Sequence, residues 1–313
     1  MQPNRLALPC LLATALLAGC GKTTSDAAST ASTATTPAPS GDAPTAPERR
    51  DAKALDAYQL IDLSPALYST AEYTSLSTQV RAAFWSGTPK QLDKLAYDYI
   101  TDYRHEPDSF KRSDMLKTLT PELEHDYADA QARQDYAVRT NTLMQVYPYD
   151  AALGGFRVSF ASNEEGSAVG IFRNAGTPHN EGAWRFRFIG VPVSGPGKDF
   201  IYHPRDEAEA RAIEATLAAQ RSRDGDSVNT FSQYEGHVLG ASWGPANDDT
   251  AVFGVDAITA VDRKTGKPLL TIGGKALGPI EVKCQSTRDA LKLASPRATG
   301  GGWDMSASSE SPC

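Results

Sequence analysis

The feature that most limits the fold is a change of hydrophobic period near residue 140. From about 52 to 139, apolar residues recur every three or four positions, as they do on the buried face of a helix. From about 141 to 285, they alternate with polar residues, and turn-forming residues separate the runs, which is typical of strands. The chain is therefore predicted to be α+β, with an N-terminal helical segment followed by a largely antiparallel β-sheet with one inserted helix.

The helical segment is expected to hold four helices. Their predicted ranges are Ala71–Trp85, 88–103, 108–119 and 120–138. Thr88-Pro89 and Thr120-Pro121 indicate two of the starts, because Thr caps helix N-termini and Pro is tolerated at the first helical position. An apolar stripe with helical spacing is expected to face the core; it consists of Leu92, Leu95, Ala96, Tyr99 and Tyr103.

The second half is expected to be mostly strands. The predicted ranges are 142–149, 155–160, 168–172, 183–193, 199–203, 237–243, 250–262 and 268–273. The last two are expected to form a hairpin in which Gly266 takes a positive φ. The inserted helix is predicted at about 206–222, because acidic residues at its start and Arg221 at its end suit the helix dipole.

A short apolar run near the N-terminus ends at Leu17-Ala18-Gly19-Cys20. A membrane-spanning helix needs about 20 apolar residues, so this shorter run, which follows the single basic residue Arg5, indicates an export signal. The tetrapeptide resembles the lipobox of bacterial lipoproteins. The resemblance implies that residues 1–19 are cleaved as a signal peptide and that Cys20 carries acyl chains such as palmitate. A secreted soluble protein is the alternative.

Residues 20–50 are expected to comprise the lipidated Cys and a disordered linker. The stretch 21–48 lacks Leu, Ile, Val and aromatic residues, so it cannot bury enough apolar surface to offset the entropy of ordering. As a coil it reaches roughly 30 Å. In lipoproteins an Asp after the lipidated Cys favours the inner membrane, whereas this chain has Gly21 and Lys22. The resemblance therefore implies lipid anchoring in the outer membrane, with the body facing the periplasm.

The charge of the chain argues against nucleic acid as a partner. Its formal net charge is -7, and loss of Arg5 with the signal leaves the mature chain at -8. A nucleic-acid binder presents a basic patch instead. The expected partners are the membrane, through the N-terminal lipid, and an envelope protein or cell-wall material.

The α+β domain, predicted at 51–285, is followed by a Gly/Ser-rich tail at 286–313. Cys284 and Cys313 are the two cysteines left in the folded body, and the periplasm is oxidising, so they are expected to form a disulfide. Closing a loop of about 30 residues would contribute roughly 3–4 kcal/mol and pin the tail. Two unpaired thiols with a loose C-terminus are the alternative.

One stretch of the body resembles a known domain. The sequence FKRSDMLKTLTPELEHDYADAQARQDYAV, leading into LMQVYPYDAALGGFRVSF, is similar to a proteobacterial lipoprotein domain of unknown function. Because that family has no assigned activity, the resemblance implies only an envelope location and the order of helices before sheet.

The stretch Gly240-Ala241-Ser242-Trp243-Gly244 matches the G-x-S-x-G pattern of a nucleophile elbow. The elbow requires a helix directly after the Ser, and the acid and His later in the chain. Here PANDDT follows, and the last histidine, His237, precedes Ser242. Ser242 is therefore expected to lie in a turn at a strand end, with Gly240 and Gly244 at positive φ, and no catalytic residue is predicted. A hydrolase that uses Ser242, His237 and an unidentified acid in another order is the alternative.

No metal or cofactor is expected. The five histidines lack metal-binding spacings, and there is no paired C-x-x-C motif. The glycine-rich stretches lack the spacing of a P-loop or of a dinucleotide-binding turn.

The sequence WRFRF offers one candidate surface. Alternation places Trp184, Phe186 and Phe188 on one face of a strand and Arg185 and Arg187 on the other. The aromatic face is expected to belong to the core. The arginine face is either a solvated surface or a binding surface for an acidic partner.

These observations predict a non-catalytic, outer-membrane-anchored periplasmic lipoprotein whose sheet presents an interaction surface. An immunity protein that neutralises an incoming toxin is one form of this function. A periplasmic hydrolase with an unrecognised site near Ser242 is the alternative.

Overall fold

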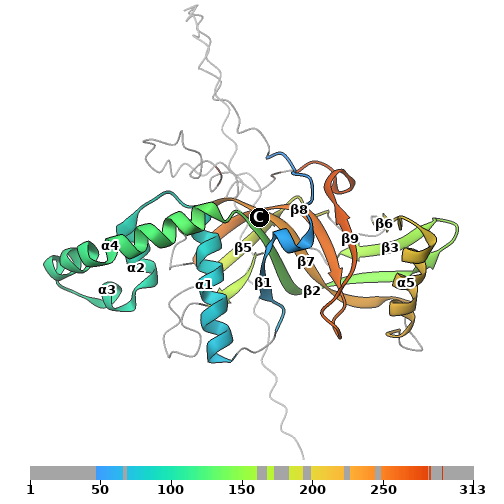
Figure 1. Cartoon of the computed structure of the whole chain (residues 1–313), viewed down its shortest axis with the longest axis horizontal. Coiled ribbons are helices and arrows are strands. Elements are labelled where there is room, and N and C mark those ends of the chain that lie inside the picture. The colour runs from blue at the N-terminus through green and yellow to red at the C-terminus, as the bar shows by residue number, and fades with distance from the viewer. Residues whose placement is uncertain are drawn as a thin grey trace, which may run out of the picture. The chain divides into compact units, whose positions relative to one another are not determined.

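The structure is a computed structural model that describes residues 47–65, 69–160, 168–172, 183–192, 199–221, 226–243, 248–280, 282 and 291. The predicted α+β class is confirmed: helices come first, a mixed, mostly antiparallel curled sheet follows, and one helix is inserted between strands (Figure 1). Within these residues, no helix is both long and apolar enough to cross a membrane.

Four helices precede most of the sheet. They are α1 (Thr70–Ser86), α2 (Leu92–Tyr99), α3 (Thr101–His105) and α4 (Ser109–Ala132). A capping box starts α1, because the Ser69 hydroxyl accepts a hydrogen bond from the Glu72 backbone N–H and the Glu72 carboxylate accepts one from Ser69. The predicted apolar stripe faces the core: Leu95, Ala96 and Tyr103 are at most 3% exposed.

Both predicted Thr-Pro helix starts are wrong. The second helix begins at Leu92, and α4 is one helix that runs through Pro121. Asp108 caps α4 by accepting hydrogen bonds from two backbone N–H groups. Pro121 removes one hydrogen bond of the helix, but Leu119 and Leu123 on either side of it pack into the same core. Tertiary packing therefore outweighs the local stop signal.

The helical segment does not extend to residue 139 as predicted. β1 (Gln59–Leu63) and β2 (Asp135–Asp150) are strands that pair in parallel, with Ile61 opposite Val138. Both of these side chains are fully buried. Because the partners of a parallel pair lie far apart in the sequence, a local hydrophobic period does not reveal the pairing.

The described strands form one nine-stranded sheet in the order β4-β5-β8-β7-β2-β3-β6, with β1 beside β2 and β9 beside β8. The remaining strands are β3 (Gly155–Phe160), β4 (Ala168–Phe172), β5 (Ala183–Ile189), β6 (Phe200–Tyr202), β7 (Val228–Ser242), β8 (Asp248–Val261) and β9 (Pro268–Gly273). β5 pairs with β8 in parallel, and the pairings other than this one and β1–β2 are antiparallel. Gly266 has a φ of 68° in the β8–β9 hairpin, as predicted.

One face of the sheet carries the core. Val138, Tyr234 and Ile258 lie side by side on β2, β7 and β8 and are at most 1% exposed. α1 packs over β7, β1, β5 and β8, whereas the inserted helix α5 (Glu207–Ala218) packs on β2 and β9. α5 confirms the predicted inserted helix, and Asp206 caps it by accepting a hydrogen bond from the Glu209 N–H at 2.8 Å.

Candidate functional site

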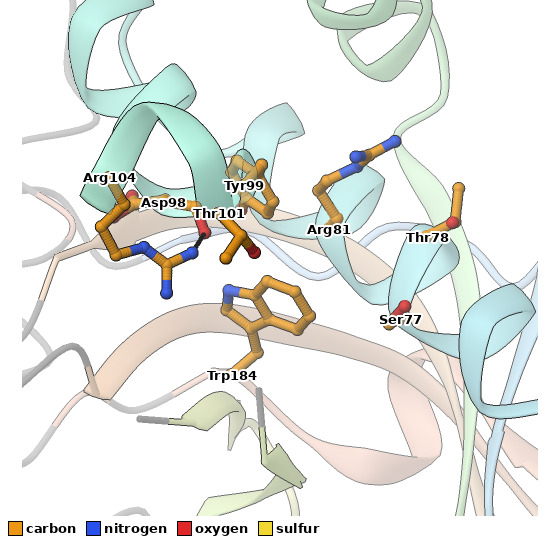
Figure 2. A pocket seen from close by; sticks show the side chains of 8 residues that line it. All are labelled: Ser77, Thr78, Arg81, Asp98, Tyr99, Thr101, Arg104 and Trp184. Carbon is orange, nitrogen blue, oxygen red and sulfur yellow. Dashed lines mark hydrogen bonds between the residues drawn. The ribbon is translucent and has the colours of Figure 1, made fainter. Parts of the chain in front are cut away.

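A small cavity lies where α1, α2 and α3 meet strand β5 (Figure 2). Its volume is about 130 Å³. The lining comes from α1 on one side, from α2 and α3 on another and from β5 below, and consists of Ser77, Thr78, Arg81, Asp98, Tyr99, Thr101, Arg104 and Trp184. The cavity therefore combines cationic, hydroxyl and aromatic groups.

Packed aromatic rings form one wall of the cavity. The rings of Tyr99 and Trp184 stack with their centres 5.4 Å apart and their planes 20° from parallel. Trp85 meets Tyr99 edge to face, with the ring centres 4.8 Å apart. Trp85 and Trp184 are only 1% and 7% exposed. Neighbouring side chains thus hold these rings in place, and the wall is preformed.

Arg104 brings one positive charge to the cavity from α3. Its Nε donates a hydrogen bond to the carbonyl of Tyr97 and its Nη2 donates one to the carbonyl of Asp98, each at 2.9 Å; Figure 2 shows the second. These carbonyls belong to the last turn of α2, where helices leave acceptors without partners. The guanidinium therefore has a defined position at the edge of the cavity.

Arg81 brings a second positive charge, from α1. Its guanidinium carbon lies 5.5 Å from the ring centre of Trp85 and 5.4 Å from that of Tyr99, within the range of cation–π attraction. Its Nη2 lies 3.6 Å from a carboxylate oxygen of Asp126 on α4, and 30% of its side chain is exposed. Arg81 thus borders both the cavity and the solvent.

Asp98 is the one carboxylate among the described residues of the lining. It is 5% exposed, and its Oδ2 accepts a hydrogen bond from the indole N–H of Trp243 at 2.5 Å. Trp243 follows the last residue of β7, so this bond ties the β7–β8 connection to α2. Phe84 contacts the same indole edge to face. Two Arg and one Asp give the described lining residues a formal charge of +1.

Ser242 lies at a strand end, as predicted, because it is the last residue of β7. Only five residues separate Ser242 from the start of β8 at Asp248, whereas a nucleophile elbow leads from its Ser directly into a helix. His237 precedes Ser242 by five residues on β7, which corresponds to roughly 16 Å of strand. Its Nδ1 lies 3.0 Å from Oδ2 of Asp256, and the two side chains are 4% and 2% exposed. The structure therefore contains a buried His–Asp pair that lies apart from Ser242.

The positive φ predicted for Gly240 is wrong. Gly240 lies instead at a β-bulge, where the register of β7 against β8 shifts between Val238 and Gly240. Gly244 lies outside the described residues.

Ser242→Ala is expected to change the free energy of unfolding by less than about 1 kcal/mol, because it removes one hydroxyl from a strand end. Thermal or urea unfolding of the two proteins measures this difference. A fluorophosphonate probe is expected to label the wild type no more than a heat-denatured control. Strong labelling that disappears in Ser242→Ala would contradict this expectation and favour the hydrolase.

The alternation predicted for β5 is confirmed. Trp184, Phe186 and Phe188 are buried in the core, whereas Arg185 and Arg187 are half-buried on the other face of the strand. In the sheet, Arg185 lies opposite Thr250 and Arg187 lies opposite Val252 of β8. Both arginines have interaction partners of their own. Their use as a binding surface stays a prediction.

The first described residues pack on the face of the sheet opposite the helices. We call residues 47–58 the N-terminal strap. Arg49 anchors the strap by donating hydrogen bonds to the carbonyls of Gly190 and Gly278, both at 2.7 Å, and to that of Val255. The backbone N–H of Arg50 donates to Asp256, the partner of His237, at 2.9 Å. Arg49 and Arg50, which fall in the expected linker, thus contact the folded body.

A polar row on β1, β2 and β7 lies on this same face. Arg139 is 3.3 Å from Asp62 and donates two hydrogen bonds to the side-chain oxygen of Gln233, at 2.9 and 3.1 Å. The amide of Gln233 in turn donates to Oε1 of Glu235 at 2.8 Å. Glu235 is fully buried, and its Oε2 has no hydrogen-bond partner among the described residues. Burial raises the pKa of Glu235 to about 7, and the hydrogen bond from Gln233 opposes this rise.

Several predicted sites lie outside the described residues. Cys20, Cys284 and Cys313 are among them, so the lipidation and the disulfide stay predictions. Within the part of the chain that the structure describes, no three His, Cys, Asp or Glu side chains gather as ligands for a metal ion.

The sequence did not indicate the cavity. Ser77, Thr78 and Arg81 have the spacing of one helix face, and Trp184 alternates toward the core, but no local pattern says that this helix face meets this strand.

No known protein family, curated protein or solved structure matches the chain.

Proposed function

We propose that this protein is a non-catalytic lipoprotein of the bacterial envelope. It is anchored in the outer membrane through acylated Cys20, faces the periplasm and acts as an interaction module. Its partner is an envelope protein or cell-wall material, and the cavity between α1, α2–α3 and β5 is the recognition site. An immunity protein that binds an incoming toxin is one form of this function.

The N-terminal region supports the tethered part of the proposal. Leu17-Ala18-Gly19-Cys20 resembles a lipobox, and the stretch after it lacks the apolar residues needed for a core. Directly after this stretch, Arg49 anchors the N-terminal strap to backbone carbonyls of the body. A body tethered through its N-terminal linker needs such an attachment, because any pull on the linker reaches the fold at that point.

One observation supports the proposal that the protein is an interaction module. The groups that line the cavity are held in place by their neighbours. Arg104 is fixed by two helix carbonyls, Arg81 by aromatic faces, and Trp184 by stacking on Tyr99. Such preorganisation lowers the entropy cost of binding. Arginine stays protonated in proteins, so these cations suit charge recognition rather than proton transfer.

The interaction module is tested by chemical crosslinking in intact cells, followed by purification of the tagged protein. We expect a stoichiometric partner with the wild type and its loss with Arg81→Gln. Arg211→Gln is the matched control, because Arg211 is an exposed arginine on α5, away from the cavity. Absence of a partner, or equal recovery with Arg81→Gln, would contradict the proposal.

Cys20→Ala is expected to move the protein from the membrane fraction to the soluble periplasmic fraction. The reason is that acylation of Cys20 is the proposed anchor, and two or three acyl chains are needed for durable membrane residence. Detergent-phase partitioning measures the change. Cys10→Ala is the matched control, since it alters a cysteine of the signal segment but leaves the lipobox intact. A Cys20→Ala protein that stays fully membrane-bound would refute the anchor.

A further inference from the structure

We infer that the cavity of Figure 2 binds an oxyanion, either a carboxylate or a phosphate, carried on a compact planar group. The inference rests on the proposed function and names the chemistry of the ligand that the recognition site takes.

Charge is the first argument. The lining contains two guanidinium groups and one carboxylate. The carboxylate, Asp98, is already engaged with the indole N–H of Trp243. Among the described lining residues, a second anion therefore meets two guanidinium groups in a partly enclosed space, where charge attraction is stronger than in water.

Hydrogen-bond donors are the second argument. Arg81 makes no hydrogen bond with any other described residue. Its contact with Asp126, at 3.6 Å, is too long for a hydrogen bond and is an ion pair between partly exposed side chains. Such exposed pairs are weak. Its cation–π contacts with Trp85 and Tyr99 use none of its hydrogen-bond donors, so its N–H groups remain for a ligand. Thr101 adds a hydroxyl to the lining from α3. Planar N–H donors are suited to carboxylate and phosphate oxygens.

Donors elsewhere in the lining are less available, which makes Arg81 the main anion contact. The hydroxyls of Ser77 and Thr78 donate to the carbonyl of Thr74 at 2.9 and 3.0 Å. Arg104 uses its Nε and one Nη2 hydrogen bond on helix carbonyls. Arg104 therefore contributes mainly its charge, whereas Arg81 contributes charge and donors.

Size and shape indicate what carries the oxyanion. The cavity volume of about 130 Å³ is close to the roughly 150 Å³ of an engineered cavity that takes up benzene. Figure 2 shows the indole of Trp184 beneath the helix residues that line the cavity. An aromatic ring favours flat groups that stack on it or meet its edge. A planar acid with about one ring beside its charge matches this space.

The test is isothermal titration calorimetry on the mature protein in detergent at low ionic strength. The probes are benzoate, its neutral counterpart benzamide, and inorganic phosphate. We expect saturable binding at one site for benzoate or phosphate, no binding of benzamide, and weaker binding as salt is added. We expect Arg81→Gln to weaken binding of the anion at least tenfold and Arg211→Gln to leave it unchanged.

A second pair of variants keeps the test decisive if Arg81→Gln is poorly folded. Thr101→Val removes a lining hydroxyl without touching the cation–π contacts, and Arg81→Lys keeps the charge without the planar donors. Both are expected to weaken anion binding, and melting temperatures show whether each variant is folded. Equal affinity of folded Arg81→Gln and wild type, or no saturable binding of either anion, overturns the inference.

The two anions distinguish the source of the oxyanion. Saturation by benzoate alone assigns a carboxylate, and saturation by phosphate alone assigns a phosphate group. The inference and the proposed function also fail in different ways. A crosslinked partner that is lost with Arg81→Gln, without anion binding by the purified protein, overturns only the oxyanion. Anion binding without any partner in cells overturns the interaction module instead.

Discussion

Replacement of Glu235 by Gln is expected to stabilise the folded protein by about 3 kcal/mol at pH 8 and to change its stability little at pH 4. Glu235 is 0% exposed, and its Oε2 lacks a hydrogen-bond partner among the described residues. Burial raises its pKa from 4.5 to about 7. Gln has the shape of the protonated side chain but cannot ionise, so it removes the cost of a buried charge.

The sign of the change in the free energy of unfolding with pH depends on whether the folded or the unfolded protein holds the Glu235 proton more tightly. Below pH 4.5 the Glu235 carboxyl is protonated in both the folded and the unfolded state, so it imposes no pH-dependent cost. Between pH 4.5 and about 7 the unfolded chain loses this proton while the folded protein keeps it. The free energy of unfolding of the wild type therefore falls as pH rises through this window, and the loss is complete above it.

Urea unfolding between pH 4 and 8.5 measures both proteins. His237, Asp256 and Arg139 lie on the same face of the sheet and are present in both proteins, so the difference between the wild type and Glu235→Gln isolates Glu235. Glu122→Gln, at an exposed position on α4, is the matched control and is expected to follow the wild type. If the free energy of unfolding changed with pH in the same way for the wild type and Glu235→Gln, Glu235 would have the same pKa in the folded and the unfolded protein, which would contradict the prediction.

Gly236→Ala is expected to destabilise the protein by more than about 3 kcal/mol. A β-carbon at this position would lie 2.0 Å from the carbonyl oxygen of Gly254 and 2.9 Å from the ring of Phe253. The oxygen belongs to the backbone of β8, so the clash is relieved only if β7 and β8 move apart. The register of these two strands shifts at Gly236, and a bulge of this kind brings the backbones close together.

Urea unfolding also measures this change, and Gly273→Ala is the matched control. A β-carbon at Gly273 would lie 3.1 Å from the Cβ of Ala52. Ala52 belongs to the exposed N-terminal strap, which can shift by a few tenths of an ångström, so a loss below about 1 kcal/mol is expected. If Gly236→Ala and Gly273→Ala lost the same free energy of unfolding, the close contact between β7 and β8 at Gly236 would not be the cause of the loss, and the prediction would be wrong.

The predicted strands and helices were most accurate where the signal is local. The alternation in WRFRF placed Trp184 and its two aromatic neighbours in the core, and Asp206 caps α5 at the predicted start. Pro121 shows the limit of such signals. It indicated a helix start from nearby residues, but the apolar residues on both sides of it pack into one core and keep α4 continuous.

The candidate site could not be predicted from the sequence, because it too depends on contacts between distant segments. Arg81, Arg104 and Trp184 each had an ordinary local explanation, as an exposed charge on a helix or as a core aromatic. They form a candidate site only because α1, α3 and β5 bring them to the same cavity. The GASWG stretch was interpreted as a turn at a strand end, and nothing in it indicated that its Trp243 binds Asp98, a residue 145 positions away.

The sequence by itself determined the α+β class, the order of helices before sheet, the inserted helix and the turn at Gly266, because these depend on contacts within a few residues. The tertiary structure alone decided the parallel pairing of β1 with β2, the burial of Glu235 and the cavity. Each of these arises where side chains from distant segments exclude water together. Their free energy depends on that shared burial, which no single segment of the chain encodes.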